Sequence, residues 1–212
     1  MKLKNIIFDW DGTLGMTLHL WLAGYRRGME NQGHEYCDAT LASEFFYEHD
    51  KGAIKYPHVD FAKLVGDAYG YIEAHLHTLA LYEMAEETLA RLRENGTQLA
   101  LVTSSPRKLL MGGLKVHNLE KYFSSIIAGD ENFEHKPHPA PFNETLRRLE
   151  IHSAETLIIG DARTDIIAGQ AARTKTCLFT PNDNQLFHNF DELSRIGADF
   201  TISSLTDIID LI

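Results

Sequence analysis

Two aspartates one residue apart, Asp9 and Asp11 in the run FDWDGTL, have the types and the spacing of a nucleophile and its acid/base partner in phosphoryl transfer. The apolar run before them, residues 3–8, predicts a buried strand, and Gly12 predicts a tight turn after it. Side chains two apart on an extended chain point to the same side, so both carboxylates can face one site beyond the strand's carboxyl end. Ligands bind at that end in open α/β sheets. Taken alone, Asp-x-Asp-Gly is also typical of a solvated turn.

A second strand-like run, residues 98–102, ends in Thr103-Ser104-Ser105-Pro106. A serine N-cap followed by proline at the first helical position predicts a helix whose first amide groups can bind an anion. The hydroxyl of Thr103, with Ser104 beside it, is therefore expected to bind a phosphoryl oxygen of the substrate. An ordinary capped turn between a strand and a helix would show the same pattern.

A single lysine, Lys136, lies between turn-forming residues in the run HKPHP, directly ahead of an amphipathic segment at residues 140–149. Such neighbours can hold a lysine rigidly as a point charge against phosphate oxygens. A lone lysine is more often a solvated surface group, so this expectation depends on its place in the series of motifs.

A second pair of acids follows another buried-looking run, residues 157–159. Asp161 comes directly after Gly160, and Asp165 follows four residues later. If a helix begins near Thr164, both carboxylates turn toward the same end of the sheet. Carboxylate oxygens gathered beside a phosphate are the ligands that Mg²⁺ prefers, so this pair predicts a magnesium site.

In this order the four groups resemble the motifs of the haloacid dehalogenase superfamily, specifically its phosphatases with a helical cap inserted after the first motif. The resemblance covers essentially the whole chain. It implies an α/β fold with a Rossmann-like, doubly wound parallel sheet and an inserted all-helical cap domain. It also implies hydrolysis of a phosphate monoester through an aspartyl-phosphate intermediate, with Mg²⁺ as the cofactor.

The resemblance further implies a role for each motif residue. Asp9 corresponds to the nucleophile and Asp11 to the acid/base. Thr103 corresponds to the phosphate-binding hydroxyl, and Lys136 to the charge clamp. The implied Mg²⁺ ligands are Asp9, Asp11 through its backbone carbonyl, Asp161 and Asp165.

Between the first and second motifs the pattern changes from strands to helices. Helices are expected at residues 18–29, with Gly33 as a stop, and after Asp38 and Asp60. From Met84 onward strands and helices alternate, which predicts a parallel, doubly wound sheet. The further expected strands are residues 125–128, 156–159, 176–179 and 200–202. We expect a catalytic core of residues 1–15 plus 83–212 and a helical cap of residues 16–82.

A cap that closes over the site would exclude water and contact the leaving group of the substrate. Arg26 is the cap residue that we assign to substrate binding. The other candidates are His19, Trp21 and Arg27. The aromatic residues of this stripe would equally serve as cap core, and the arginines as solvated groups. His75 and His77 do not predict a metal site, because residues two apart on a helix point away from each other.

The formal net charge of −10 and the pI of about 5.5 disfavour binding to nucleic acid. A small phosphorylated metabolite therefore needs local attraction, for which the candidates are Mg²⁺, Lys136 and a cap arginine. Two cysteines are too few for a disulfide framework. No apolar run reaches membrane-spanning length, and the first strand starts too early for a signal peptide. We expect a cytoplasmic monomer or homodimer with no membrane partner.

Two departures from the family pattern affect the flap between core and cap. Many capped relatives carry Asp-Ser where this chain has Met16-Thr17, and Ser where it has Ala162. The leading hypothesis is a phosphatase of the phosphoglycolate phosphatase-like type. A sugar phosphomutase of the β-phosphoglucomutase type is the alternative, although Trp21 stands in the region where such mutases carry a histidine. Dehalogenation is disfavoured because those relatives lack the second acid, Asp11. The intact motifs also disfavour a non-catalytic protein that binds a phosphorylated ligand.

Overall fold

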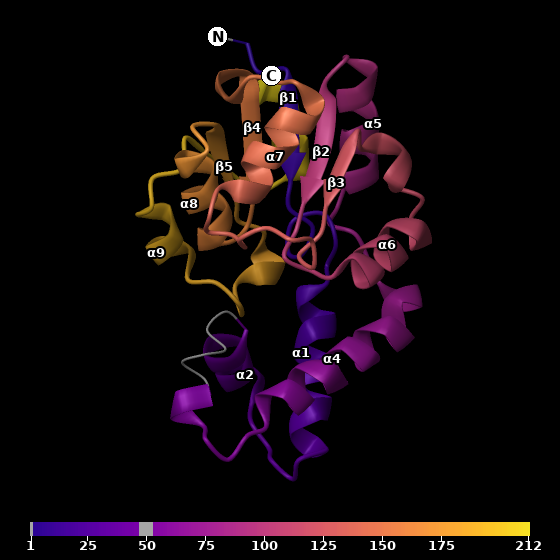
Figure 1. The fold of residues 1–212 in the computed structure, drawn as a ribbon, viewed down its shortest axis with the longest axis vertical. Helices are drawn as coiled ribbons and strands as arrows, with labels where there is room; N and C mark the ends of the chain where they lie inside the picture. The colour runs from indigo at the N-terminus through magenta and orange to yellow at the C-terminus, as the bar shows by residue number, and fades with distance from the viewer. Residues whose placement is uncertain (1, 47–52) are drawn as a thin grey trace.

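A parallel six-stranded sheet forms the centre of the protein, whose computed structural model describes residues 2–46 and 53–212. The strand order is β3-β2-β1-β4-β5-β6 (Figure 1). The strands are β1 (Asn5–Phe8), β2 (Gln98–Val102), β3 (Ser125–Ile127), β4 (Thr156–Gly160), β5 (Lys175–Phe179) and β6 (Phe200–Ile202). The predicted α/β fold with a doubly wound parallel sheet and a helical cap region is confirmed.

The first strand lies in the middle of the sheet, and all four of its residues are buried. Ile7 pairs with Ala100 of β2 on one side and with Ile158 of β4 on the other. A central parallel strand is covered on both faces, which explains its continuous apolar sequence. After β1 the chain adds β2 and then β3 on one side of it. The chain then crosses over and adds β4 on the other side of β1. The crevice at this switch point is where ligands bind in such sheets, just beyond Phe8.

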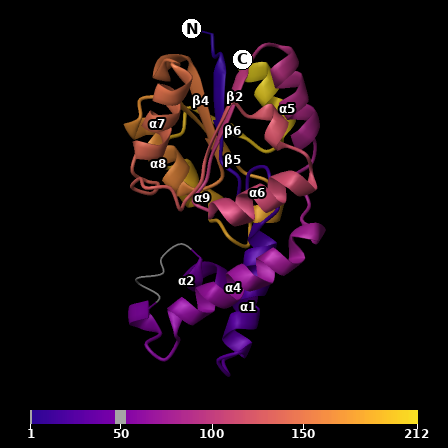
Figure 2. The ribbon, with the colours of Figure 1, turned by 45° about the vertical axis from the view of Figure 1, so that its right-hand side comes forward.

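Helices cover both faces of the sheet (Figure 2). On one face, Ile6 and Phe8 belong to a core cluster with apolar residues of α5, α6 and the final 3₁₀ helix η5. On the other face, Ile7 belongs to a cluster with residues of α7 and α8. The alternation of side chains along β1 therefore divides its apolar residues between two cores. The helices are α5 (Ala85–Glu94), α6 (Arg107–Val116), α7 (Ala140–Leu149), α8 (Arg163–Ala171), α9 (Phe190–Ser194) and η5 (Leu205–Leu211).

The cap region lies beyond the carboxyl ends of the strands (Figure 1). Its described helices include α1 (Leu18–Glu30), α2 (Asp38–Phe45) and α4 (Phe61–His75), which confirms the three helices expected there. They enclose a separate hydrophobic cluster that includes Leu22, Phe45 and Leu64. The expected cap range of 16–82 includes residues 47–52, which lie outside the described residues.

Two chain segments connect the sheet to the cap, and they run side by side. Met16 N–H donates to the carbonyl of Ala80 at 2.9 Å, and Tyr82 N–H donates to the carbonyl of Leu14 at 3.0 Å. This pairing lies next to the predicted limits at residues 15–16 and 82–83, but the division into two domains stays a prediction. Among the helices of residues 2–46 and 53–212, none combines the length and the apolar character needed to cross a bilayer.

Glycines on α1 allow close contact with α4. A Cβ built on Gly24 would lie 2.9 Å from the Cα of Ala68, whereas one on Gly70 of the exposed side of α4 meets no atom within 4 Å. We predict that Gly24→Ala lowers the free energy of unfolding by about 1–3 kcal/mol, because backbone must move apart. The matched change Gly70→Ala should raise it by about 0.5–1 kcal/mol through helix propensity. Urea unfolding of both variants measures this, and an equal effect of the two would contradict the packing argument.

Candidate active site

Three buried carboxylates meet beyond the carboxyl ends of β1 and β4. Asp9 directly follows β1, Asp161 directly follows β4, and Asp165 lies in the first turn of α8. Carboxylate oxygens of the three lie within 4.8 Å of one another. The turn after Asp9 makes this approach possible, because Gly12 has a φ of +74° and a Cβ there would lie 1.9 Å from Oδ2 of Asp161.

Lys136 joins two of these carboxylates. Its Nζ donates to Oδ1 of Asp9 at 2.9 Å and to Oδ1 of Asp165 at 2.7 Å. A further bond of 3.3 Å goes to the carbonyl of Val102 at the end of β2. The side chain is buried, with an exposed fraction of 3%. An ammonium has three donors, and all three are accounted for here, so Lys136 holds the acidic residues in place.

The electrostatics of this cluster favour a bound cation. Burial raises the pKa of Asp9 well above its ordinary value, the carboxylate of Asp165 raises it further, and Lys136 lowers it in part. Burial alone would lower the pKa of Lys136, but the carboxylates of Asp165 and Asp9 outweigh burial and raise it. Counted in their ionised forms, three carboxylates and one ammonium give the cluster a formal charge of −2.

These residues fit a divalent metal ion. Buried charges need partners, and a divalent cation would neutralise the excess negative charge of the cluster. The donors are carboxylate oxygens, which are the ligands that Mg²⁺ prefers. Of the four predicted metal ligands, the structure brings together the side chains of Asp9, Asp161 and Asp165. The side chain of Asp11 lies outside this group, and ligation through its backbone carbonyl stays a prediction.

Asp11 faces the cap instead. Its Oδ1 accepts hydrogen bonds from Thr17 Oγ1 at 2.6 Å and from Trp21 Nε1 at 3.2 Å. Its Oδ2 accepts a hydrogen bond from Thr103 Oγ1 at 3.0 Å. Three donors therefore fix the carboxylate at the boundary between core and cap. Thr17, which departs from the family pattern, thus orients the predicted acid/base.

The loop after β2 differs from the sequence expectation in two respects. Pro106 is the N-cap residue and α6 begins at Arg107, so the predicted serine cap with proline at the first helical position is wrong. The amide of Arg107 instead donates to Oδ1 of Asp130 at 2.9 Å, so a carboxylate from another loop occupies the helix end. Ser104 lines the cavity described below. The hydroxyl of Thr103 is directed to Asp11, and its binding to phosphate stays a prediction.

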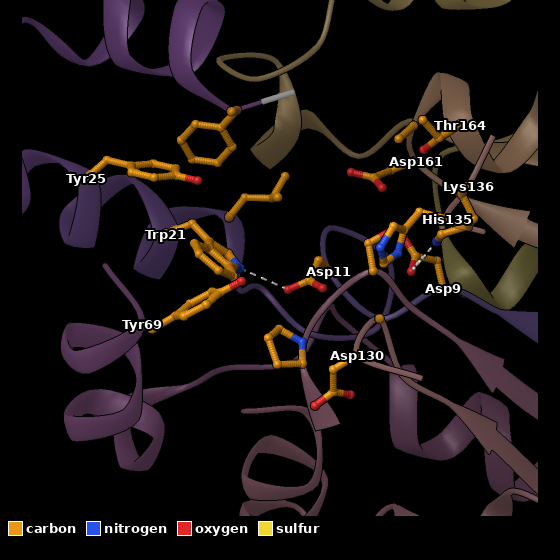
Figure 3. Close-up of a pocket in the computed structure, with 16 residues that line it drawn as sticks. Asp9, Asp11, Trp21, Tyr25, Tyr69, Asp130, His135, Lys136, Asp161 and Thr164 are labelled. Atoms are coloured by element: carbon orange, nitrogen blue, oxygen red, sulfur yellow. Dashed lines mark hydrogen bonds and ion pairs between the residues drawn. The ribbon is translucent and has the colours of Figure 1, made fainter. Parts of the chain in front are cut away.

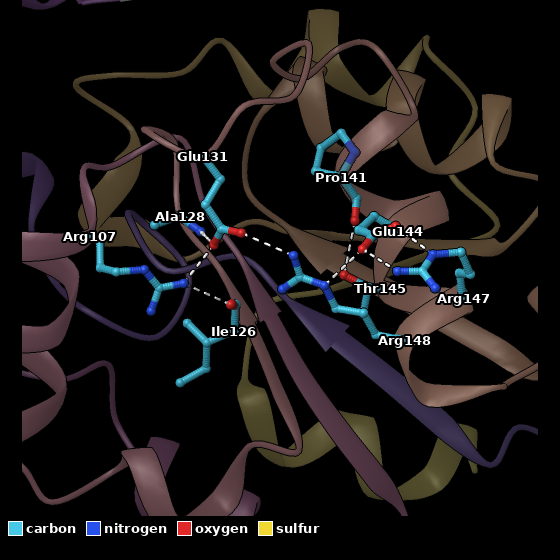
Figure 4. Close-up of polar contacts among 9 residues, drawn as sticks. All are labelled: Arg107, Ile126, Ala128, Glu131, Pro141, Glu144, Thr145, Arg147 and Arg148. Atoms are coloured by element: carbon cyan, nitrogen blue, oxygen red, sulfur yellow. Dashed lines mark hydrogen bonds and ion pairs between the residues drawn. The ribbon is translucent and has the colours of Figure 1, made fainter.

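A charged network anchors the segment that leads to Lys136 (Figure 4). Glu131 accepts hydrogen bonds from Arg107 at 2.6 Å, from the amide of Ala128 at 3.0 Å and from Arg148 at 3.1 Å. Burial alone would raise the pKa of Glu131, but these three donors lower it. Arg107 and Arg148 come from α6 and α7. The network therefore ties the loop after β3 to helices on both faces of the sheet.

Two residues that the sequence analysis did not identify hold Asp161. Oδ2 of Asp161 lies 2.8 Å from His188 Nε2 and accepts a hydrogen bond of 2.9 Å from Asn184 Nδ2. Asn184 also donates to the carbonyl of Gly12 at 2.9 Å and accepts a hydrogen bond from the hydroxyl of Tyr82. His188 partly counteracts the rise that burial causes in the pKa of Asp161.

Both residues lie in the loop after β5, which carries no motif spacing that could have revealed them. The same loop reaches the cap, because Phe187 belongs to the cap cluster. Its ring centroid lies 5.1 Å from those of Phe46 and His19. The loop thus contacts Asp161 and the cap through adjacent side chains.

A cavity of about 890 Å³ extends from the acidic cluster to the cap. Asp9, Lys136 and Asp161 line it on the core side, and Trp21, Tyr25 and Tyr69 line it on the cap side (Figure 3). Asp11 lies between the two groups (Figure 3).

The other cap candidates lie elsewhere. Arg26, which we assigned to substrate binding, is exposed and forms an ion pair of 2.5 Å with Asp38. Arg27 is exposed and pairs with Glu30 at 3.3 Å. Neither arginine lines the cavity, and neither does His19.

The sequence profile of the haloacid dehalogenase-like hydrolases matches residues 6–179. The chain belongs to this family. The expected hydrolase with phosphatase-like relatives is therefore confirmed. The position of the acidic cluster at the carboxyl ends of β1 and β4 agrees with the motif order from which the family resemblance was inferred.

Relatives in sequence include two proteins named pyrophosphatase PpaX. The one from Halalkalibacterium halodurans is 27% identical over 221 residues, which cover 100% of this chain and 98% of that protein. The one from Bacillus mycoides is 29% identical over 185 residues and 83% of each chain. Among solved structures, a predicted phosphoglycolate phosphatase from Haemophilus somnus superimposes with a TM-score of 0.84 at 22% identity, over 99% of this chain and 98% of that one.

Another solved structure is a haloacid dehalogenase family hydrolase from Deinococcus radiodurans, with bound phosphate and sodium. It has a TM-score of 0.80 and 22% identity, over 97% of this chain and 93% of that chain. At these identities, the structural neighbours establish the fold.

His188 should strengthen metal binding by fixing the orientation of Asp161. We predict that His188→Leu weakens Mg²⁺ binding by about 10- to 100-fold, as loss of a hydrogen bond to a metal ligand usually does. His188→Gln keeps an N–H donor and should recover most of the affinity. Isothermal titration with Mg²⁺ measures both variants, and urea unfolding checks that they fold. Parent-like affinity in the leucine variant would exclude this role.

Proposed function

We propose that the protein is a Mg²⁺-dependent phosphatase that hydrolyses a small phosphate monoester through an aspartyl-phosphate on Asp9. The single observation that carries the proposal is the position of Asp9. This buried carboxylate lies in the acidic cluster, is held by Lys136, and lines the cavity together with Asp11. The bound phosphate in the hydrolase from Deinococcus radiodurans supports a phosphate site in this fold.

In the first step, a carboxylate oxygen of Asp9 attacks phosphorus, and the bond between phosphorus and the ester oxygen breaks. Asp11 gives a proton to that ester oxygen, which leaves as an alcohol. In the second step, a water oxygen attacks phosphorus and the bond to Asp9 breaks. Asp11 takes the proton of the water, which restores both carboxyl groups and releases inorganic phosphate.

The other residues orient these two acids. Lys136 engages Oδ1 of Asp9, so the remaining oxygen, Oδ2, is the one we assign to the attack. Thr17 donates a hydrogen bond to Oδ1 of Asp11, and Thr103 donates one to Oδ2, so both carboxylate oxygens are held. Mg²⁺, held by Asp9, Asp161, Asp165 and the carbonyl of Asp11, would neutralise negative charge on the transferring group.

Loss of the nucleophile should abolish turnover. We predict that Asp9→Asn lowers phosphate release by at least about 10³-fold, because an amide cannot form the acyl phosphate. Asp210→Asn, at an exposed aspartate near the C-terminus, is the matched control and should retain parent activity. Phosphate release from a panel of metabolites measures both variants. An Asp9→Asn protein as active as the parent would refute the mechanism.

Metal binding should stabilise the folded protein. At a Mg²⁺ concentration of about 100 times the dissociation constant, we expect about 2.7 kcal/mol of added stability over the protein in EDTA. Asp161→Asn removes a charge from the cluster and should abolish most of this shift. Thermal unfolding with EDTA and with Mg²⁺ gives the comparison. An unchanged melting temperature in the parent would argue against the metal site.

A further inference from the structure

We infer that the leaving alcohol of the substrate carries no net negative charge and presents a flat ring to the cap side of the cavity. The inference rests on the proposed phosphatase function and names its substrate class. It depends on an aromatic wall, which we define as Trp21, Tyr25, Phe46 and Tyr69. All four residues line the cavity.

The wall starts at the group that would protonate the leaving oxygen. The indole N–H of Trp21 donates to Oδ1 of Asp11 at 3.2 Å, which fixes the ring beside that carboxylate. An ester oxygen that receives a proton from Asp11 must lie within hydrogen-bond distance of it. The first atoms of the leaving group beyond that oxygen therefore contact Trp21.

The rings continue away from the acidic cluster. The Trp21 ring centroid lies 5.3 Å from that of Tyr69 in an edge-on contact and 5.9 Å from that of Tyr25 (Figure 3). Tyr25 in turn lies 5.2 Å from Phe46, again edge-on. Tyr69 lines the cavity and has an exposed fraction of 37%, so part of its side chain is accessible. Offset and edge-on contacts between aromatic rings are favourable, and the rings of the wall already make such contacts with one another. A flat ring of the substrate in the cavity would make the same kind of contact with the wall.

The charges that line the cavity disfavour an anionic leaving group. Among the described lining residues, Lys136 is the one lysine or arginine, and its donors are already bonded. Asp11 and Asp130 also line the cavity, and Asp11 lies between the cluster and the wall (Figure 3). A glycolate carboxylate or a second phosphate on the leaving side would meet these acids without a partner from the cap arginines, which pair on the outer surface.

The size of the cavity agrees with a ring. About 890 Å³ lies in the range of pockets that hold drug-sized ligands. A leaving group of two carbons, or a choline group, would fill little of this space. The chemistry shared by nucleoside 5′-monophosphates and by phosphate esters of a heteroaromatic alcohol, such as pyridoxal 5′-phosphate, fits both the volume and the wall.

A substrate comparison tests the inference. With Mg²⁺, we expect kcat/KM for the best ring substrate to exceed that for 2-phosphoglycolate, pyrophosphate and phosphocholine by about tenfold or more. Nucleoside monophosphates and pyridoxal 5′-phosphate form separate arms, which identify the source of the ring. Preference for any of the three compounds without a ring would overturn the inference.

Tyr69 variants test the wall itself. Tyr69→Ala should lower the ratio of kcat/KM for the ring substrate to kcat/KM for acetyl phosphate by about fivefold, mainly through KM. Tyr69→Phe keeps the ring and should keep the ratio within about twofold. Lys63→Ala, at an exposed residue of α4 that does not line the cavity, should leave the ratio unchanged. An equal loss on both substrates in Tyr69→Ala would overturn the inference, because it would show no selective contact with the ring.

Binding separates this inference from the proposed function. Isothermal titration of the Asp9→Asn protein with Mg²⁺ should give about tenfold tighter binding of the ring phosphate than of 2-phosphoglycolate. If the parent protein releases no phosphate from any compound, including acetyl phosphate, the proposed function fails. The relative affinities for the ring phosphate and for 2-phosphoglycolate would still test the aromatic wall in that case. Equal affinities, or the reverse order, would overturn the substrate class even in an active phosphatase.

Discussion

The contact of one buried ammonium with two buried carboxylates is the constraint on which the rest of the site depends. Lys136 bonds both Asp9 and Asp165, and with Asp161 the four groups still carry excess negative charge. Excess buried charge is costly unless the geometry is well fixed, and a bound cation would offset it. The parallel sheet supplies that geometry, because the carboxyl ends of β1 and β4 are adjacent in it.

The cap and the core are connected through the acids themselves. Thr17 and Trp21, at the start of the cap, bond Asp11, and the loop after β5 contacts Asp161 through His188 and the cap through Phe187. A displacement of the cap therefore changes the surroundings of both acids. This arrangement gives a physical route by which an occupied cavity can bring Asp11, the proposed acid/base, into position.

The chain has a formal net charge of −10, and acidic residues also outnumber lysine and arginine among the described residues that line the cavity. Asp11 lies between the acidic cluster and the aromatic wall, while Lys136 is buried among the carboxylates of the cluster. In the proposed reaction, the cluster with a bound metal would attract phosphate, and the aromatic wall would contact the remainder of the substrate. Arg26 and Arg27 satisfy acidic neighbours on the outside of α1, where exposed ion pairs contribute little to stability.

Local patterns determined the elements and the motif residues. The apolar runs before Asp9 and Asp161 form the expected central strands, because a strand buried on both faces has a continuous apolar sequence. The apolar residues that recur at helical spacing from Leu18 form the expected cap helix, because one side of that helix is buried. The order of the motifs was sufficient to predict that distant acids meet. Only the tertiary structure decided that Thr103 turns to Asp11, that Asp130 occupies the start of α6, and that Arg26 lies outside the cavity. His188 and Asn184 were invisible for the same reason: their role comes from contacts between segments far apart in the chain, and no local spacing records such contacts.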